Sequence, residues 1–157
     1  VELKSTSVCA VGTPHDSRGS VWFRIRAGEE KIGYFTDIGH LSESVLRGLS
    51  GCKRVVIESN HDIEMLKNGS YPYSLKQRIL SDRGHLSNEL CAKLLPHLAA
   101  FGTESFMLAH LSEENNRPDV AYEESLASLI TNGYRVNEGD SSLTLRVAPR
   151  ASVLEVK

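Results

Sequence analysis

The sequence predicts a single α/β domain, spanning residues 1–157, with a mixed β-sheet and flanking helices. Short runs rich in Val, Ile and Phe alternate with segments whose apolar residues recur every three or four positions. The first of these runs follow one another closely enough to form a hairpin. A chain of 157 residues that is 40% hydrophobic can build one core of its own. The sequence contains no internal repeat, low-complexity tract or linker.

The first part of the chain is predicted to be β-strand. TSVCAVG (6–12) is short and apolar, and in SVWFRIRA (20–27) apolar residues occupy alternate positions, as in a strand with one buried face. KIGYFTDIG (31–39) follows after a turn at GEE. We therefore expect two of these three strands to pair as a hairpin.

A helix and a buried strand come next. ESVLRGL (43–49) has the pattern of a helix that Ser42 or Ser44 caps and that glycines end. RVVIESN (54–60) is rich in β-branched residues and reads as a buried strand. Strand, helix and strand of these lengths predict a βαβ unit, in which the two strands run parallel.

The second half of the chain alternates helices with strands. We expect a strand at 104–110, with Pro118 opening the helix that follows it, and we expect Pro96 to kink or shorten the longest helix. The remaining predicted elements are helices at 62–69, 71–80, 85–102 and 117–133 and terminal strands at 143–148 and 152–156.

Composition excludes several classes of protein. The net charge of −2 gives no general attraction to nucleic acid or anionic lipid, although a local basic groove would still be compatible with it. Cys9, Cys52 and Cys91 are odd in number and lack CxxC spacing, which favours free thiols in a reducing compartment. No apolar stretch reaches the roughly 18 residues that cross a bilayer, and the first residues do not resemble a signal peptide. We therefore expect a cytoplasmic protein that does not bind membranes.

Several predicted strands end at a residue that can bind a metal or move a proton. The side chains of an open α/β sheet converge beyond the carboxyl ends of its strands, where ligands bind. A single His or Asp in such a place more often caps a turn or a helix, but the combination favours a site for zinc, manganese or iron. These residues are His15, Asp37, Glu58 with His61, and His110.

His85 is a further candidate, in the sequence GHLSNE at the start of the longest predicted helix. The segment is equally well explained as a helix start, with Ser87 or Asn88 as the cap. A histidine held there by backbone would suit proton transfer near neutral pH. His40 and His97 have weaker claims, as a cap and as a surface or packing residue.

Four segments together carry a resemblance to a known family. They resemble the C-terminal half of metallo-β-lactamase-fold hydrolases of the YycJ/WalJ type, over roughly residues 14–121. The block from Glu58 to Asn88, within the longest segment, is long and unusual enough to be specific. The segments are TPHDS, FTDIGH, VVIESNHDIEMLKNGSYPYSLKQRILSDRGHLSNE and AHLSEENNRPDVA.

The resemblance implies half of an αββα sandwich and a phosphodiesterase or nuclease that uses two divalent metal ions. The metals would be zinc or manganese, with iron as a further alternative. By position in the motifs, His15 and His110 would each bind one metal, Asp37 would bridge them, and Glu58 and His85 would shuttle a proton to the leaving group. Asn115 and Asn116 are expected to cap the following helix and to hydrogen-bond a ligand histidine, and His61 is expected to support the ligands without binding metal itself.

One departure from the family pattern affects the functional prediction. The HxHxDH motif, which supplies four metal ligands in the family, is absent, and the chain begins with Val rather than Met. We therefore expect a piece of a longer hydrolase that binds metal weakly and is inactive alone, with nucleic acid or a small phosphodiester as substrate. An exposed sheet face would favour a homodimer or a complementing N-terminal half. The alternative is a non-catalytic half-fold, either an interaction module or a degenerate subunit.

A cysteine or serine nucleophile is disfavoured, because no nucleophile elbow or paired histidine is present.

Overall fold

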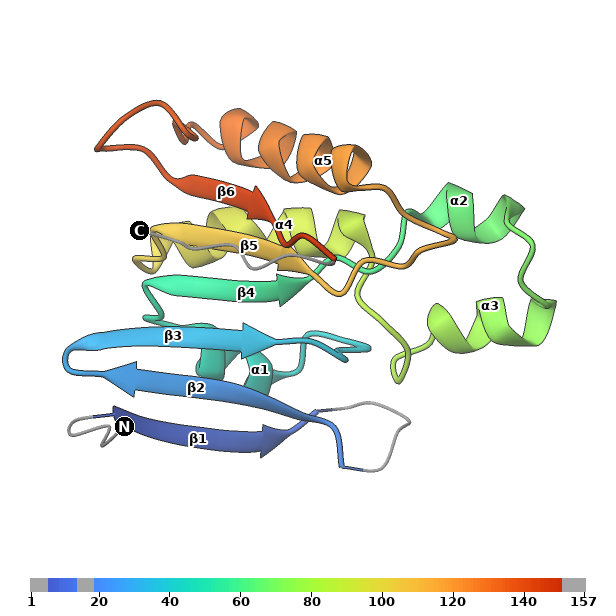
Figure 1. Cartoon of the computed structure of the whole chain (residues 1–157), viewed down its shortest axis with the longest axis horizontal. Coiled ribbons are helices and arrows are strands. Elements are labelled where there is room, and N and C mark those ends of the chain that lie inside the picture. Colours follow the sequence, from blue (N-terminus) through green and yellow to red (C-terminus); the bar gives the residue numbers. More distant parts are fainter. Residues whose placement is uncertain (1–5, 14–18, 151–157) are drawn as a thin grey trace.

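The computed structural model describes residues 6–13 and 19–150. These residues form a six-stranded sheet in which the strands lie side by side in chain order (Figure 1). The first three strands pair antiparallel and the last four pair parallel, so the predicted hairpin, βαβ unit and mixed sheet are confirmed. The strands are β1 (Thr6–Gly12), β2 (Val21–Ala27), β3 (Glu30–Phe35), β4 (Arg54–Glu58), β5 (Ser105–Ala109) and β6 (Thr144–Val147). The predicted strand at 152–156 lies outside the described residues.

The first helix has its predicted bounds, and the other four occupy the predicted segments with slightly shorter bounds. Ser42, rather than Ser44, caps the first of them, because its Oγ accepts a hydrogen bond from the Val45 N–H at 3.3 Å. In the described ranges, no helix has the length and apolar character needed to cross a bilayer. The helices are α1 (Glu43–Leu49), α2 (Ile63–Asn68), α3 (Tyr73–Ile79), α4 (Asn88–Ala100) and α5 (Pro118–Thr131).

Of the two effects expected of Pro96, a kink or a shorter helix, the shortening is wrong. Helix α4 continues past Pro96 to Ala100. A proline removes one backbone hydrogen bond from a helix, but the buried side chains around it, including Leu94, Leu95 and Leu98, hold this turn against the core. Tertiary packing therefore outweighs the local preference.

One face of the sheet carries the core. Residues of α1, α4 and α5 pack together with inward residues of β2 to β6 in a single buried cluster. Trp22 and Phe35 stack there with ring centroids 4.5 Å apart. A Cβ atom on Gly48 would lie 2.5 Å from the Trp22 indole, so this glycine allows α1 to approach the sheet closely.

The opposite face of the sheet is mainly apolar, although Arg54 and Arg146 also lie on it, and no helix of the described ranges covers it (Figure 1). Val8 and Tyr34 are 58% and 43% exposed on this open face. Strand register places further apolar side chains beside them, namely Phe23, Ile25, Ile32, Val56 and Met107. The described chain is thus a two-layer structure with helices on one side.

The carboxyl ends of β3, β4 and β5 meet at one edge of the sheet, and α2 and α3 lie beyond that edge (Figure 1). Loops that leave neighbouring parallel strands at the same edge bring residues distant in sequence together. This edge contains the candidate functional residues.

Candidate active site

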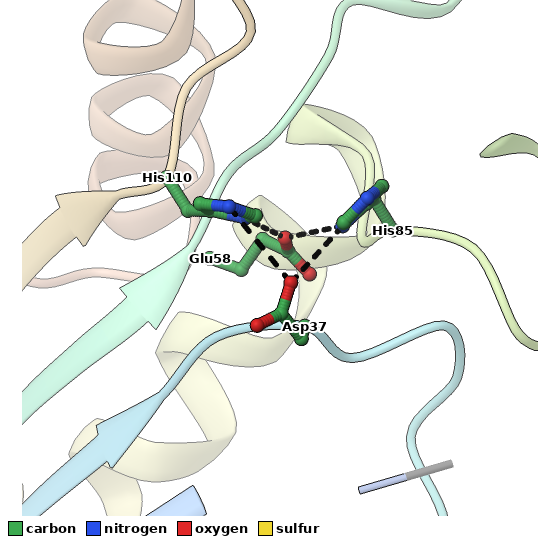
Figure 2. Close-up of side chains that lie close together, drawn as sticks. All are labelled: Asp37, Glu58, His85 and His110. Atoms are coloured by element: carbon green, nitrogen blue, oxygen red, sulfur yellow. Dashed lines mark hydrogen bonds and ion pairs between the residues drawn. The ribbon is translucent and has the colours of Figure 1, made fainter. Parts of the chain in front are cut away.

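Four of the residues singled out from the sequence lie together at this edge. Asp37 follows β3, Glu58 is the last residue of β4, and His110 follows β5 directly. His85 joins them from the loop before α4 (Figure 2). One ligand atom from each of the four lies within 4.8 Å of those of the others.

Glu58 is the centre of the cluster. Its side chain is completely buried, and its Oε1 accepts hydrogen bonds from Nδ1 of His85 at 2.8 Å and Nδ1 of His110 at 2.5 Å (Figure 2). Its Oε2 accepts from the backbone N–H groups of Ile38 at 2.9 Å and Leu86 at 3.1 Å. Both oxygens are therefore fully used in holding the loops that carry the other residues.

The charge on Glu58 is stabilised by these contacts. Burial alone would raise the pKa of Glu58, but the hydrogen bonds from His110 and His85, together with the Ile38 N–H, lower it to about 2. The same hydrogen bond to Glu58 raises the pKa of His110 against the opposing effect of burial, with help from the charge on Asp37. The hydrogen bond thus favours the charged form of each partner.

Both histidine rings present Nδ1 to Glu58, and this determines what their other nitrogens can do. A carboxylate only accepts hydrogen bonds, so each Nδ1 carries a proton and Nε2 is on the far side of each ring. Nε2 of His110 lies 3.8 Å from Oδ1 of Asp37 (Figure 2). The two rings are tilted against each other with centroids 5.2 Å apart.

The backbone at this site is strained. Asp37 and His110 have φ angles of 56° and 58°, in the left-handed region of backbone conformation that residues other than glycine rarely adopt. Among the described residues only Asn137 shares this conformation without being glycine. Such residues cost about 1–3 kcal/mol each and concentrate at functional sites. Both residues nevertheless present their side chains to the cluster (Figure 2).

The chemistry of the donors fits a divalent cation between Asp37 and His110. A cation 2.0–2.2 Å from each atom, as is usual for zinc, would fit between ligand atoms about 3–4 Å apart. The Glu58 carboxylate accepts a hydrogen bond from Nδ1 of His110, and histidines that bind metal through Nε2 commonly have such a carboxylate partner. Glu58 is less suited to bind metal itself, because four hydrogen bonds occupy its oxygens. Two ligands do not hold a cation tightly, so further ligands are needed from outside this cluster.

The other predicted site residues are placed differently. His15 lies outside the described residues. His61 is buried beside Asn60, and burial lowers its pKa to about 4, so it is neutral near pH 7. His40 contacts the Asp82 carbonyl oxygen through Nδ1 at 2.8 Å, and His97 is exposed on α4.

Asn115 and Asn116 do not contact a histidine ring through any hydrogen bond found in the described residues. Asn116 is buried and donates to the carbonyl oxygens of Ser59 at 2.8 Å and Asn60 at 3.0 Å. The backbone carbonyl of Asn115 accepts from the Asp62 N–H at 2.9 Å. Both residues therefore brace the segment 59–62 that directly follows Glu58.

Sequence reasoning missed the residues that complete this brace. Asn60 donates from its side chain to the His110 carbonyl oxygen at 2.8 Å, which holds the strained turn after β5. Ser59 donates to Asn88 Oδ1 at 2.7 Å, and Asn88 in turn bonds Asn116. The sequence does contain a sign of these residues, because Ser59 and Asn60 are small polar residues directly after a β-branched strand. Only their neighbours Glu58 and His61 were predicted to belong to the site.

Comparisons with known proteins agree with this architecture. No family model matches the sequence. The chain is 36% identical over 127 residues to exodeoxyribonuclease YycJ of Bacillus anthracis, covering 81% of this chain and 48% of that protein. It is 38% identical over 111 residues to exodeoxyribonuclease WalJ of Streptococcus pneumoniae, covering 71% of this chain and 41% of that protein. The chain thus spans about half the length of the curated relatives it matches.

Solved structures show the same fold. The metallo-β-lactamase fold protein YhfI of Bacillus subtilis matches 80% of this chain and 43% of its own, with a TM-score of 0.55 and 15% identity. Zinc-bound PqqB of Methylobacterium extorquens matches 97% of this chain and 47% of its own, with a TM-score of 0.56 and 15% identity. The fold is therefore that of the metallo-β-lactamase proteins, as predicted. Within that class, the chain belongs to the YycJ/WalJ family.

Proposed function

We propose that this chain is part of a metal-dependent phosphodiester hydrolase that acts on nucleic acid. The observation that carries the proposal is the arrangement in which buried Glu58 holds His85 and His110 while Asp37 faces both rings. The exodeoxyribonuclease names of the two relatives support nucleic acid as the substrate class. A structure of a diphosphatase from the PhnP family, with a TM-score of 0.50 and 11% identity, covers 94% of this chain and 42% of its own, and it shares the fold alone.

Each residue of the cluster has a distinct role in this proposal. Two bound divalent cations, zinc or manganese with iron as an alternative, would supply a hydroxide and stabilise the oxygens of the phosphodiester. Asp37 would be shared by the two cations, and His110 and His15 would each hold one of them. His85, oriented through Nδ1 by Glu58, donates a proton from Nε2 to the departing alkoxide.

The chain alone supplies too few ligands for this chemistry. We propose that the remaining ligands come from a second half-domain, whether that half lies in a longer form of the protein or in a separate polypeptide. The isolated chain is then expected to bind metal weakly and to cleave nothing. Free Cys9, Cys52 and Cys91 accord with a reducing, cytoplasmic location.

The test compares this chain with the same chain joined to the N-terminal half of the Bacillus anthracis relative. The joined protein should cleave single-stranded DNA and a simple phosphodiester in the presence of manganese or zinc, and a chelator should abolish the cleavage. The isolated chain should cleave neither substrate under the same conditions. If the joined protein binds two metals yet leaves every phosphodiester intact, the nuclease assignment fails while a metal-dependent hydrolase remains.

The open sheet face favours a second role, that of an interface. We propose that it packs against another apolar sheet, either that of a complementing half-domain or that of a second copy of this chain. Apolar side chains gathered on one face of a sheet are characteristic of association surfaces. This role does not require catalysis and would also suit a non-catalytic subunit.

Lysine substitutions on the open face should weaken this association. The double variant Val8→Lys, Tyr34→Lys adds two positive charges to side chains that are 58% and 43% exposed, so it should shift a dimer toward monomer in sedimentation velocity. Tyr73→Lys is the matched control, because Tyr73 is 78% exposed on α3, away from the sheet. A dimer that persists unchanged in the double variant would show that another surface forms it.

A further inference from the structure

A cavity of about 540 Å³ lies directly beside the candidate active site. His85 and His110 line it together with Tyr71, Leu75, Arg78 and Ile79, of which the last three belong to α3. The volume lies within the range of roughly 300–1,000 Å³ that small-molecule sites occupy. The roles proposed above use none of the residues from α3.

Helix α3 is tied firmly to the loop that carries His85. The backbone N–H of His85 donates to the carbonyl oxygen of Ile79, at the end of α3, at 3.1 Å. A Cβ atom on Gly84 would lie 2.1 Å from that same carbonyl oxygen, so only glycine allows this approach. On its other side, Lys76 donates to the Gly69 carbonyl oxygen at 2.7 Å and so anchors α3 to the end of α2. The side chains of α3 therefore keep a set position relative to His85.

The lining of the cavity combines a cation, an aromatic ring and apolar side chains. Arg78 supplies a guanidinium, Tyr71 a phenol ring and Leu75 an apolar surface. Guanidinium groups bind phosphate oxygens in pairs, and aromatic side chains stack on nucleic-acid bases of any sequence. Two acidic residues also line the cavity. Glu113 forms an ion pair with Arg150 at 3.3 Å, and Glu114 is exposed.

We propose that this cavity binds one nucleotide unit of the substrate, on the leaving-group side of the bond that is cut. Arg78 binds the phosphate of that nucleotide and Tyr71 stacks on its base. His85, which lines the cavity, is the residue proposed to protonate the leaving oxygen, so the cavity is assigned to the leaving-group side of the bond. This assignment rests on the proposed function. Stacking does not distinguish bases, so the site accepts all four nucleotides.

The experiment measures binding of nucleoside monophosphates by the chain itself, in excess chelator, by chemical-shift changes in two-dimensional NMR. dAMP and dTMP should both bind at millimolar concentration, with shifts at Tyr71, Leu75 and Arg78, while deoxyadenosine should bind at least tenfold more weakly. Arg78→Gln and Tyr71→Leu should each weaken dAMP binding by about tenfold, from loss of a charge-assisted hydrogen bond and of base stacking respectively.

Arg83→Gln and Tyr73→Leu are the matched controls, because both residues are exposed near α3 and neither lines the cavity. They should bind dAMP like the unchanged chain, and spectra of all four variants should show an intact fold. The proposal is overturned if dAMP produces no shifts at these residues, if the controls lose as much affinity as the cavity variants, or if Arg78→Gln and Tyr71→Leu retain full affinity.

This measurement is independent of the hydrolysis test. Nucleotide binding in chelator together with a joined protein that cleaves no phosphodiester would leave the cavity assignment standing and remove the proposed activity. Metal-dependent cleavage without nucleotide binding in this cavity would support the proposed activity and remove the cavity assignment.

Discussion

Replacing Asp37 with asparagine should lower the metal-dependent hydrolysis of the joined protein by at least about 100-fold. Loss of a residue that only supports a metal ligand typically costs about 10–100-fold in metal affinity or activity, and Asp37 is proposed to bind both cations directly. An amide has nearly the same shape as the carboxylate but carries no charge. Metal affinity from calorimetric titration and the rate of phosphodiester cleavage should fall together.

Asparagine is the appropriate substitute because Asp37 has a φ angle of 56°, a conformation that asparagine tolerates better than alanine. The melting temperature of the metal-free protein should therefore change little. Asp140→Asn, at an exposed turn before β6, is the control and should leave metal affinity intact. Unchanged metal affinity in Asp37→Asn would show that Asp37 is not a ligand.

Replacing Glu58 with alanine should lower the free energy of unfolding by about 3–5 kcal/mol. The substitution removes the acceptor for two imidazole rings and for the backbone N–H groups of Ile38 and Leu86, in a position with no exposure. A buried donor left without a partner costs its full desolvation penalty. For a protein of this size the melting temperature in chelator should fall by at least about 6 °C.

Glu104→Ala is the matched control for Glu58→Ala, since Glu104 is exposed and its ion pair with Lys53 at 3.5 Å lies at the surface. It should change stability little. A melting temperature for Glu58→Ala within a degree of the unchanged chain would contradict the central role of this carboxylate.

The pH dependence of stability gives a second measure of the same interaction. The pKa of Glu58 is lowered from 4.5 to about 2, so its contribution is present above pH 4.5 and is lost as the pH falls toward 2. The pKa of His110 is raised above 6.5, so its contribution is present below that value and is lost as the pH rises through the raised value. The metal-free chain should thus lose more stability between pH 4.5 and 3 than Glu58→Gln does.

Most helices and strands could be predicted from local patterns. The helix at 43–49 has its predicted bounds, because its cap and the spacing of its apolar residues are both local features. Pro96 shows the limit of this approach, since the packing of α4 against the core decided that the helix continues. Loop residues were harder to predict, and Asn60 was missed because its partner, the His110 carbonyl oxygen, is 50 residues away.

The sequence by itself determined the α/β class, the family and the residue types that can bind metal or transfer protons, because each strand that enters the site ends in such a residue. Only the tertiary structure decided which of them meet. The side-by-side order of β3, β4 and β5 brings Asp37, Glu58 and His110 to one edge, and the contact of α3 with the His85 loop adds the fourth residue. Strand order and loop conformation depend on contacts between distant residues, and periodicity within one segment carries no record of them.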